Sequence, residues 1–186
     1  MKILHVDSSI NGKDSFSKKL SLEIVEYLEE KNQDVTVKYV DLSESAPAHF
    51  SVNDFESIEN NHHLTVFLSC DVIVIGAPMY NFTIPTQLKA WLDRLAVSGK
   101  TFRYSSQGVE GLVRNKRVIL ALSRGGYYFE NDALKDFEHQ ESYLKCFFKF
   151  IGVENIETIR LEGINLGDKG ITKAFLNARH AIKQLK

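Results

Sequence analysis

Three segments of this chain, residues 8–17, 78–85 and 123–126, combine residue types that suit a small ligand with a phosphate group and a planar ring. The first segment is rich in serine, the second places aromatic and thioether side chains between two prolines, and the third contains two consecutive glycines. Each follows a short apolar run of the kind that forms a buried strand. Their chemistry therefore depends on whether the fold brings the three segments together.

The serine-rich segment offers hydroxyl groups at the start of a predicted helix. Ser9, Ser15 and Ser17 lie there, with Phe16 between the last two. Hydroxyls and free N–H groups at a helix N-terminus suit a phosphate dianion, because the helix dipole is positive at that end. The same serines could equally serve only as helix caps. Since the chain has neither a GxxxxGK(S/T) loop nor a GxGxxG turn, a mononucleotide phosphate is the better prediction.

The second segment reads PMYNFTIP and places large side chains where a planar ring would lie. Backbone amides held there can bind the edge of an isoalloxazine ring while Met79 and Phe82 pack on its faces. Tyr80 and Asn81 stand between them. The alternative is an ordinary apolar loop over the sheet edge, but a polar Asn81 among bulky neighbours favours a specific ligand.

The third segment, SRGG, allows a close approach of the backbone to a ligand. The amides of Gly125 and Gly126 can face a ring carbonyl that gains negative charge on reduction. A sharp turn is the structural alternative. Ser123, followed by Arg124, also resembles the serine of a relaxed nucleophile elbow, which would make the protein a serine hydrolase. That interpretation is weaker because residues 127–132 read as a loop, whereas an elbow leads directly into a helix.

The elements that must position these segments alternate regularly. Apolar runs predict strands at 1–7, 34–40, 71–77, 116–123 and 155–161, and helical spacing predicts helices at 15–31, 54–69, 86–97, 134–150 and 169–184. Five alternations predict a doubly wound, five-stranded parallel sheet in an α/β/α arrangement of the flavodoxin type. Strand 71–77 is β-branched on both faces and is expected at the centre. In such sheets ligands bind at the carboxyl ends of the strands, which all three segments follow.

Composition sets the remaining limits. The 186 residues suit one domain spanning 1–186, and 44% apolar and 25% charged residues are ordinary for a globular protein. A net charge of −1 gives no reason to expect a nucleic-acid partner. The apolar runs predict no membrane span and no signal peptide, so a cytoplasmic protein is expected. Cys70 and Cys146 predict neither a disulfide nor a metal site. Between Lys38 and Lys89 there is no Lys or Arg, which favours NADH over NADPH.

Several motifs together resemble one known family. They are SSxxxxxSxS (8–17), PMYNFTIPTQLKAWLD (78–93), GKTFRY (99–104) with GVEGL (108–112), and SRGG (123–126). In this combination and order the chain resembles the bacterial FMN-dependent NADH azoreductases, also described as NADH:quinone oxidoreductases. The resemblance implies a flavodoxin-like homodimer that binds FMN non-covalently, takes hydride from NADH and passes two electrons to a quinone or an azo compound in ping-pong fashion. It also implies cofactor-binding roles for Ser9, Ser15, Phe16, Ser17, Met79, Tyr80, Asn81, Phe82, Ser123, Arg124, Gly125 and Gly126. The resemblance further implies a substrate pocket shaped by Tyr104, Tyr127 and Tyr128, part of which the partner subunit supplies.

No dedicated acid or base is implied, because the flavin carries the chemistry and the protein supplies position and charge stabilisation. Two departures from the family pattern concern the site. Phe16 replaces a polar residue, so it can contact a phosphate only through its backbone, and the connection after the second strand is short. The helix after PMYNFTIP, with Trp91, is the expected dimer interface. The alternative function is a flavodoxin-like electron carrier without turnover of its own, although such carriers are usually strongly acidic.

Overall fold

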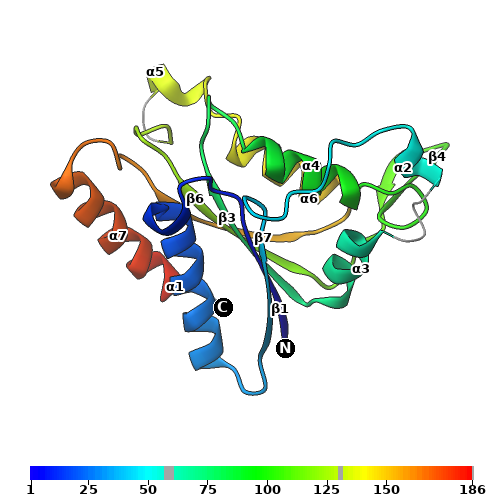
Figure 1. Ribbon diagram of the computed structural model, residues 1–186, viewed down its shortest axis with the longest axis horizontal. Coiled ribbons are helices and arrows are strands. Elements are labelled where there is room, and N and C mark those ends of the chain that lie inside the picture. The colour runs from blue at the N-terminus through cyan, green and yellow to red at the C-terminus, as the bar shows by residue number, and fades with distance from the viewer. Residues whose placement is uncertain (57–60, 130–131, 186) are drawn as a thin grey trace.

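A parallel β-sheet forms the centre of the computed structural model, which describes residues 1–185 except 57–60 and 130–131 (Figure 1). The strand order β2-β1-β3-β6-β7 places β3 in the middle, and every pair of neighbours is parallel. The predicted doubly wound, five-stranded sheet is therefore confirmed. Its strands are β1 (Lys2–Asp7), β2 (Thr36–Asp41), β3 (Val72–Pro78), β6 (Arg117–Ser123) and β7 (Asn155–Leu161).

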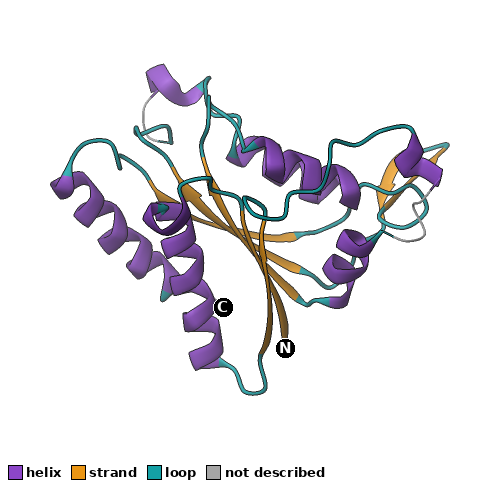
Figure 2. Cartoon of the chain, viewed as in Figure 1, coloured by secondary structure: helices purple, strands orange, loops and turns teal. Residues whose placement is uncertain are grey.

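Helices cover both faces of the sheet, as Figure 2 shows. On one face lie α1 (Phe16–Lys31) and α7 (Asp168–Ile182), and on the other lie α3 (His62–Ser69), α4 (Thr86–Leu95) and α6 (Glu141–Phe150). Side chains of β3 alternate between these layers, because Val74 packs with α1 and α7 while Ile73 and Ile75 pack with the other three helices. All seven residues of β3 are buried, which explains its β-branched sequence.

Two predicted helices are each divided in the structure. The range 54–69 overlaps α2 (Asn53–Glu56) and contains α3, and the range 134–150 overlaps α5 (Asp132–Lys135) and contains α6. In both cases a polar side chain starts a new helix. The side chain of Asn61 accepts a hydrogen bond from the Leu64 amide at 3.1 Å, and Glu138 accepts one from the Glu141 amide at 2.6 Å. Apolar spacing continued through these caps, so the pattern alone joined the helices.

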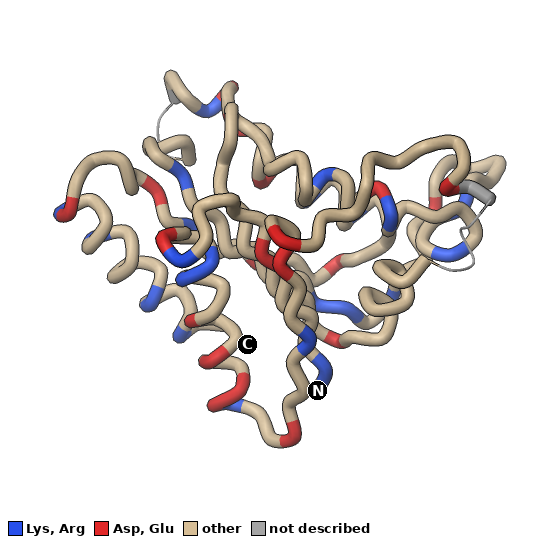
Figure 3. Tube along the Cα trace, in the orientation of Figure 1, with Lys and Arg blue, Asp and Glu red and all other residues tan. Residues whose placement is uncertain are grey.

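A small antiparallel hairpin was not predicted from the sequence. It consists of β4 (Phe102–Ser105) and β5 (Gly108–Gly111), and it follows α4. Outside residues 39–88, which contain acidic residues but no Lys or Arg, basic and acidic residues are interspersed along the chain (Figure 3). Within the described residues, no helix combines the length and apolarity needed to cross a bilayer.

Candidate functional site

The loops that follow β1, β3 and β6 meet at the carboxyl edge of the sheet. The Tyr80 hydroxyl lies 3.3 Å from the Ser9 hydroxyl and accepts a hydrogen bond from the Ile10 amide, also at 3.3 Å. The Met79 amide donates to the Ser123 carbonyl at 2.8 Å. The loop after β3 is thus bonded to both of its neighbours, and the fold brings the three predicted segments together.

In the serine-rich segment, residues 8–17, which we call the serine loop, side chains cap α1 while two backbone amides have no acceptor within the described structure. The Ser15 hydroxyl accepts a hydrogen bond from the Lys18 amide at 3.2 Å and lies 3.1 Å from the Ser17 hydroxyl. Among the described residues, the amides of Phe16 and Ser17 have no hydrogen-bond partner. Capping and anion binding are therefore compatible here. The Phe16 ring packs against Phe175, with centroids 6.2 Å apart, so only its amide faces the loop.

The segment after β3 forms a tight, strained turn. Tyr80 and Thr83 exchange two backbone hydrogen bonds of 2.9 and 3.1 Å. Between them, Asn81 and Phe82 have φ angles of 47° and 71°. Asn tolerates a positive φ, but for a bulky Phe it is a strained conformation of the kind that clusters at ligand sites. In the described part of the chain no group accepts from the amides of Asn81 and Phe82, so this turn also presents open donors.

The segment after β6 that contains Gly125 and Gly126, residues 123–126, is called the glycine loop. The carbonyl groups of its two glycines accept hydrogen bonds, and their amides are open. The Gly125 carbonyl accepts from the Asn165 amide at 3.2 Å, and the Gly126 carbonyl accepts from the Gly163 amide at 3.1 Å. Neither glycine amide has an acceptor within the described ranges. A Cβ on Gly125 would lie 2.4 Å from Nδ2 of Asn165, so a side chain does not fit there without a shift. Free amides on a backbone without side chains suit the edge of a planar, carbonyl-bearing ring.

The side chain of Arg124, a residue predicted to contact the cofactor, points away from the edge where the loops meet. Its side chain is fully buried and turned into the protein, where Nε donates to Gln140 Oε1 at 2.9 Å. Its two terminal nitrogens bind the carboxylates of Glu138, Glu141 and Glu162, each at 3.1 Å. Arg124 therefore holds the glycine loop in place and has no side-chain donor directed at the edge where the loops meet.

Gln140 is a site-supporting residue that the sequence did not reveal. It is completely buried, and its side-chain amide donates to the Ala77 carbonyl at 2.9 Å while its oxygen accepts from Arg124. It thereby connects the end of β3 with the loop after β6. The only sequence signal was a polar cluster, EHQE at 138–141, inside a range predicted as an amphipathic helix.

Glu141 completes this polar cluster. Burial by itself favours the neutral acid, but hydrogen bonds from Arg160 and Lys145 outweigh it and lower the pKa of Glu141 to about 2. Arg160 binds both carboxylate oxygens of Glu141, with Nε and one terminal nitrogen at 2.6 Å. Glu141 is therefore ionised at neutral pH, and its contacts link α6 to β7 and the glycine loop.

The three tyrosines predicted for the substrate pocket lie in different places. Tyr127 and Tyr128 directly follow the glycine loop, and the Tyr128 amide donates to Glu162 at 3.0 Å. Tyr104 is 73% exposed on the β4–β5 hairpin, beyond the far end of α4 (Figure 1). Since a ten-residue helix is about 15 Å long, Tyr104 cannot join the pocket of its own chain. The Trp91 side chain is 1% exposed in the core, so it is not available on the surface for the expected dimer interface. The helix itself as an interface, and Tyr104 as a pocket residue in a dimer, stay predictions.

The serine-hydrolase alternative gains no support from the surroundings of Ser123. The side chain is buried at the end of β6, and no histidine of the described chain contacts it. His139 lies near the turn after β3, where its amide donates to the Phe82 carbonyl at 2.9 Å. Ser123 thus lacks the base that an acyl-enzyme mechanism requires.

A flavodoxin-like sheet with open amides at its carboxyl edge is typical of proteins that bind a mononucleotide. Comparisons with known proteins agree with this assignment. The model of a family described by its flavodoxin-like fold matches residues 1–185. The FMN-dependent NADH:quinone oxidoreductase of Albidiferax ferrireducens is 45% identical over 96% of both chains, and that of Idiomarina loihiensis (number 1) is 43% identical over 100% of both. A crystal structure of azoreductase from Bacillus anthracis, 26% identical, covers 100% of both chains with a TM-score of 0.87. The chain belongs to the flavodoxin-like fold family and, within it, to the FMN-dependent NADH:quinone oxidoreductases.

Proposed function

We propose that this protein is an FMN-dependent NADH oxidoreductase that transfers two electrons to quinones and to azo compounds, whose azo bond it cleaves reductively. The observation that carries the proposal is the convergence, at one edge of the sheet, of backbone donors from three loops that have no acceptor among the described residues. The chain is 41–45% identical to relatives named FMN-dependent NADH:quinone oxidoreductase, such as those of Acidovorax ebreus and Albidiferax ferrireducens. The whole chain would form one FMN-binding domain.

The residues present fit FMN along its whole length. The hydroxyls of Ser9, Ser15 and Ser17, with the amides of Phe16 and Ser17, would hold the phosphate. The turn of residues 79–82 would line the ring, with its amides at the ring edge and the Met79 and Phe82 side chains against the faces. Ser123 and the amides of Gly125 and Gly126 would face the pyrimidine edge, where negative charge develops on reduction.

FMN, when bound, would supply the redox chemistry, which is hydride transfer from NADH and two-electron transfer to the acceptor. NADH and the acceptor would occupy the same site in turn, so we expect ping-pong kinetics. The task of the protein is to orient the reactants, exclude water and stabilise charge. Fixed amides achieve the last because they need no reorganisation when charge develops. Tyr127 and Tyr128, next to the glycine loop, would shape the acceptor pocket.

A homodimer would complete the site. Large apolar side chains are exposed on the loops at this edge, with Ile10, Phe82 and Phe137 at 62%, 45% and 47% exposure. An apolar rim around a polar edge suits a second copy of the chain that covers the ring face.

The cysteines Cys70 and Cys146 are free, which suits a cytoplasmic location.

The test starts with purified protein. We expect a yellow preparation that releases flavin on denaturation and oxidises NADH with benzoquinone or an azo dye as acceptor, with parallel lines in double-reciprocal plots at varied acceptor concentration. Flavin without turnover would indicate the electron carrier instead. A protein that binds no flavin but reacts with a serine-directed probe would contradict the proposal in favour of the hydrolase.

A further inference from the structure

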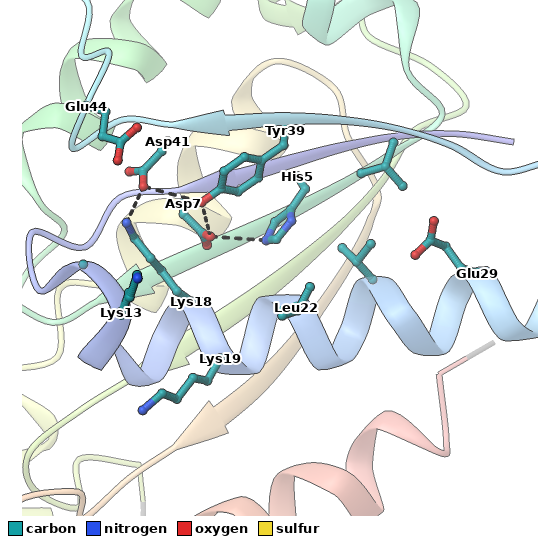
Figure 4. Close-up of a pocket in the computed structure, with 13 residues that line it drawn as sticks. His5, Asp7, Lys13, Lys18, Lys19, Leu22, Glu29, Tyr39, Asp41 and Glu44 are labelled. Carbon is teal, nitrogen blue, oxygen red and sulfur yellow. Dashed lines mark hydrogen bonds and ion pairs between the residues drawn. The ribbon is translucent and has the colours of Figure 1, made fainter.

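A groove of about 620 Å³ runs along one side of α1, over the open face of β1 and β2 (Figure 4). It exists because α1 and α7 pack mainly on β3, β6 and β7, which leaves the edge of the sheet uncovered on that face. His5, Asp7, Tyr39, Asp41 and Lys18 line its inner end, next to the serine loop. None of these side chains has a task in the proposed redox function.

The floor of the groove holds a hydrogen-bonded chain of side chains. Nε2 of His5 lies 2.8 Å from the Ser21 hydroxyl, which donates to Oδ1 of Asp7 at 2.7 Å. The Tyr39 hydroxyl donates to Oδ2 of Asp7 at 3.1 Å. Asp7 is 2% exposed and His5 is 5% exposed. Each oxygen of this buried carboxylate accepts a hydrogen bond from a hydroxyl group, and Nε2 of His5 also lies 3.5 Å from Oδ2.

Gly76 makes room for this contact. It pairs with Asp7 across β1 and β3, and a Cβ at this position would lie 2.1 Å from Oδ1 of Asp7 and 2.9 Å from the Ser21 hydroxyl. Its carbonyl accepts two hydrogen bonds from Ser8, at 3.0 Å from the amide and 2.9 Å from the hydroxyl. One residue of β3 therefore determines where the serine loop begins and how closely α1, at the end of that loop, approaches the sheet.

We propose that Gly76, Asp7 and Ser21 are positioning residues. They fix the distance between the two ends of the serine loop, and this distance determines the affinity of the site for the phosphate group of FMN. The inference rests on the proposed function, because it takes FMN as the ligand. Ser8 fixes the first residue of the loop, and Ser21, one turn into α1 from Ser17, fixes the helix that presents the amides of Phe16 and Ser17. A shift of α1 along the sheet would separate those donors from Ser9.

The charges around Asp7 indicate that its role is geometric. Lys18 is paired with Asp41, so it does not neutralise Asp7. Nε2 of His5 lies 3.5 Å from Oδ2 of Asp7. The Tyr39 hydroxyl stands between Asp41, at 3.5 Å, and Asp7. Burial, together with the nearby charges of Asp7 and Asp41, raises the pKa of Tyr39, so the hydroxyl remains a donor. A buried anion beside a phosphate site opposes binding by its charge. Asp7 therefore contributes to affinity through the contact with Ser21 that holds α1.

The experiment compares FMN with riboflavin, which has the same ring but no phosphate. The dissociation constants of both are measured by flavin fluorescence for the apoprotein, Ser21→Ala and Leu22→Ala. Leu22 is the next residue of α1, lines the same groove and is 49% exposed, but it makes no contact with the Asp7 network. In Ser21→Ala we expect the FMN affinity to fall about tenfold, the effect of roughly one hydrogen bond to a charged group, with riboflavin affinity unchanged. Leu22→Ala should leave both constants unchanged.

Two further variants keep the result decisive. Tyr39→Phe, on the exposed edge strand, should weaken FMN binding in the same selective way but less, because it removes the longer of the two hydrogen bonds to Asp7. Gly76→Ala should have the largest selective effect. Equal losses for FMN and riboflavin, or no loss in Ser21→Ala and Tyr39→Phe, would overturn the positioning role. A wild-type protein that binds both flavins equally would instead contradict the proposed phosphate site.

Discussion

Replacement of Arg124 by methionine tests whether the glycine loop depends on the buried cluster behind it. The substitution keeps most of the aliphatic length but removes all four hydrogen bonds of the guanidinium group. Removing one partner from a buried ionic cluster costs about 3–5 kcal/mol of unfolding free energy. Here each carboxylate keeps another donor, such as the Gln140 amide for Glu138 and the Tyr128 amide for Glu162. We therefore expect a loss near the lower limit, about 3 kcal/mol.

Urea denaturation of the apoprotein, followed by far-UV circular dichroism, measures this loss without the flavin. Arg124→Lys should lie between wild type and Arg124→Met, because lysine keeps the charge but lacks the planar fork that reaches several acceptors. Lys89→Ala is the matched control, since it breaks an exposed pair with Asp93 and should cost below about 0.5 kcal/mol. A loss below about 1 kcal/mol in Arg124→Met, or a loss that 0.5 M salt abolishes, would refute the reasoning, because a fully buried cluster is poorly screened.

Three other predictions concern the cofactor, pH and substrate. Gly125→Val should lower FMN affinity at least about tenfold, because its side chain would meet Asn165; unchanged affinity of the folded variant in a fluorescence titration would contradict this. The pKa of Glu141 is lowered from 4.5 to about 2, so its contribution is complete above pH 4.5 and is lost as the pH falls towards 2. Glu141→Gln should remove roughly 3 kcal/mol of the wild-type decline in stability between pH 5 and pH 2, as measured by urea denaturation across that range. Phe137 packs on Phe82, with ring centroids 5.2 Å apart, and Phe82 would lie against the flavin ring. Phe137→Ala should therefore raise the KM for benzoquinone several-fold with little change in kcat, and an unchanged KM would show that Phe137 does not support acceptor binding.

The sequence was most informative where one periodicity applied to a whole element. The strand at 71–77 and the helix at 15–31 were predicted nearly to the residue, because their apolar patterns match the burial that the sheet imposes. The helices at 54–69 and 134–150 were predicted too long. Their apolar spacing continues across Asn61 and Glu138, which start new helices by accepting amide hydrogen bonds.

The position of the candidate site followed from topology. Because the carboxyl ends of parallel strands share one edge, any three loops that follow such strands must lie near each other. The direction of individual side chains did not follow. Arg124 turns inward because Glu138, Glu141 and Glu162, which are distant in sequence, offer it carboxylates in the interior. Tyr104 lies on a hairpin that no apolar pattern indicated, so its distance from the other tyrosines could not be inferred.

The connections between the loops lead to one more consequence for the site. Tyr80 joins the serine loop to the turn after β3, and Gln140 with Arg124 joins the end of β3 to the glycine loop. In each connection, the side chain that joins two loops is not itself one of the groups that carry the open amides at the sheet edge. Side chains that a ligand does not have to displace therefore fix the positions of the amides. Binding can then occur without rearrangement of the loops, which is what a preorganised site requires. Removal of the Ser21 side-chain hydrogen bonds should accordingly weaken the contacts with the phosphate of FMN. Removal of those of Arg124 should weaken the contacts with the ring edge of the same ligand.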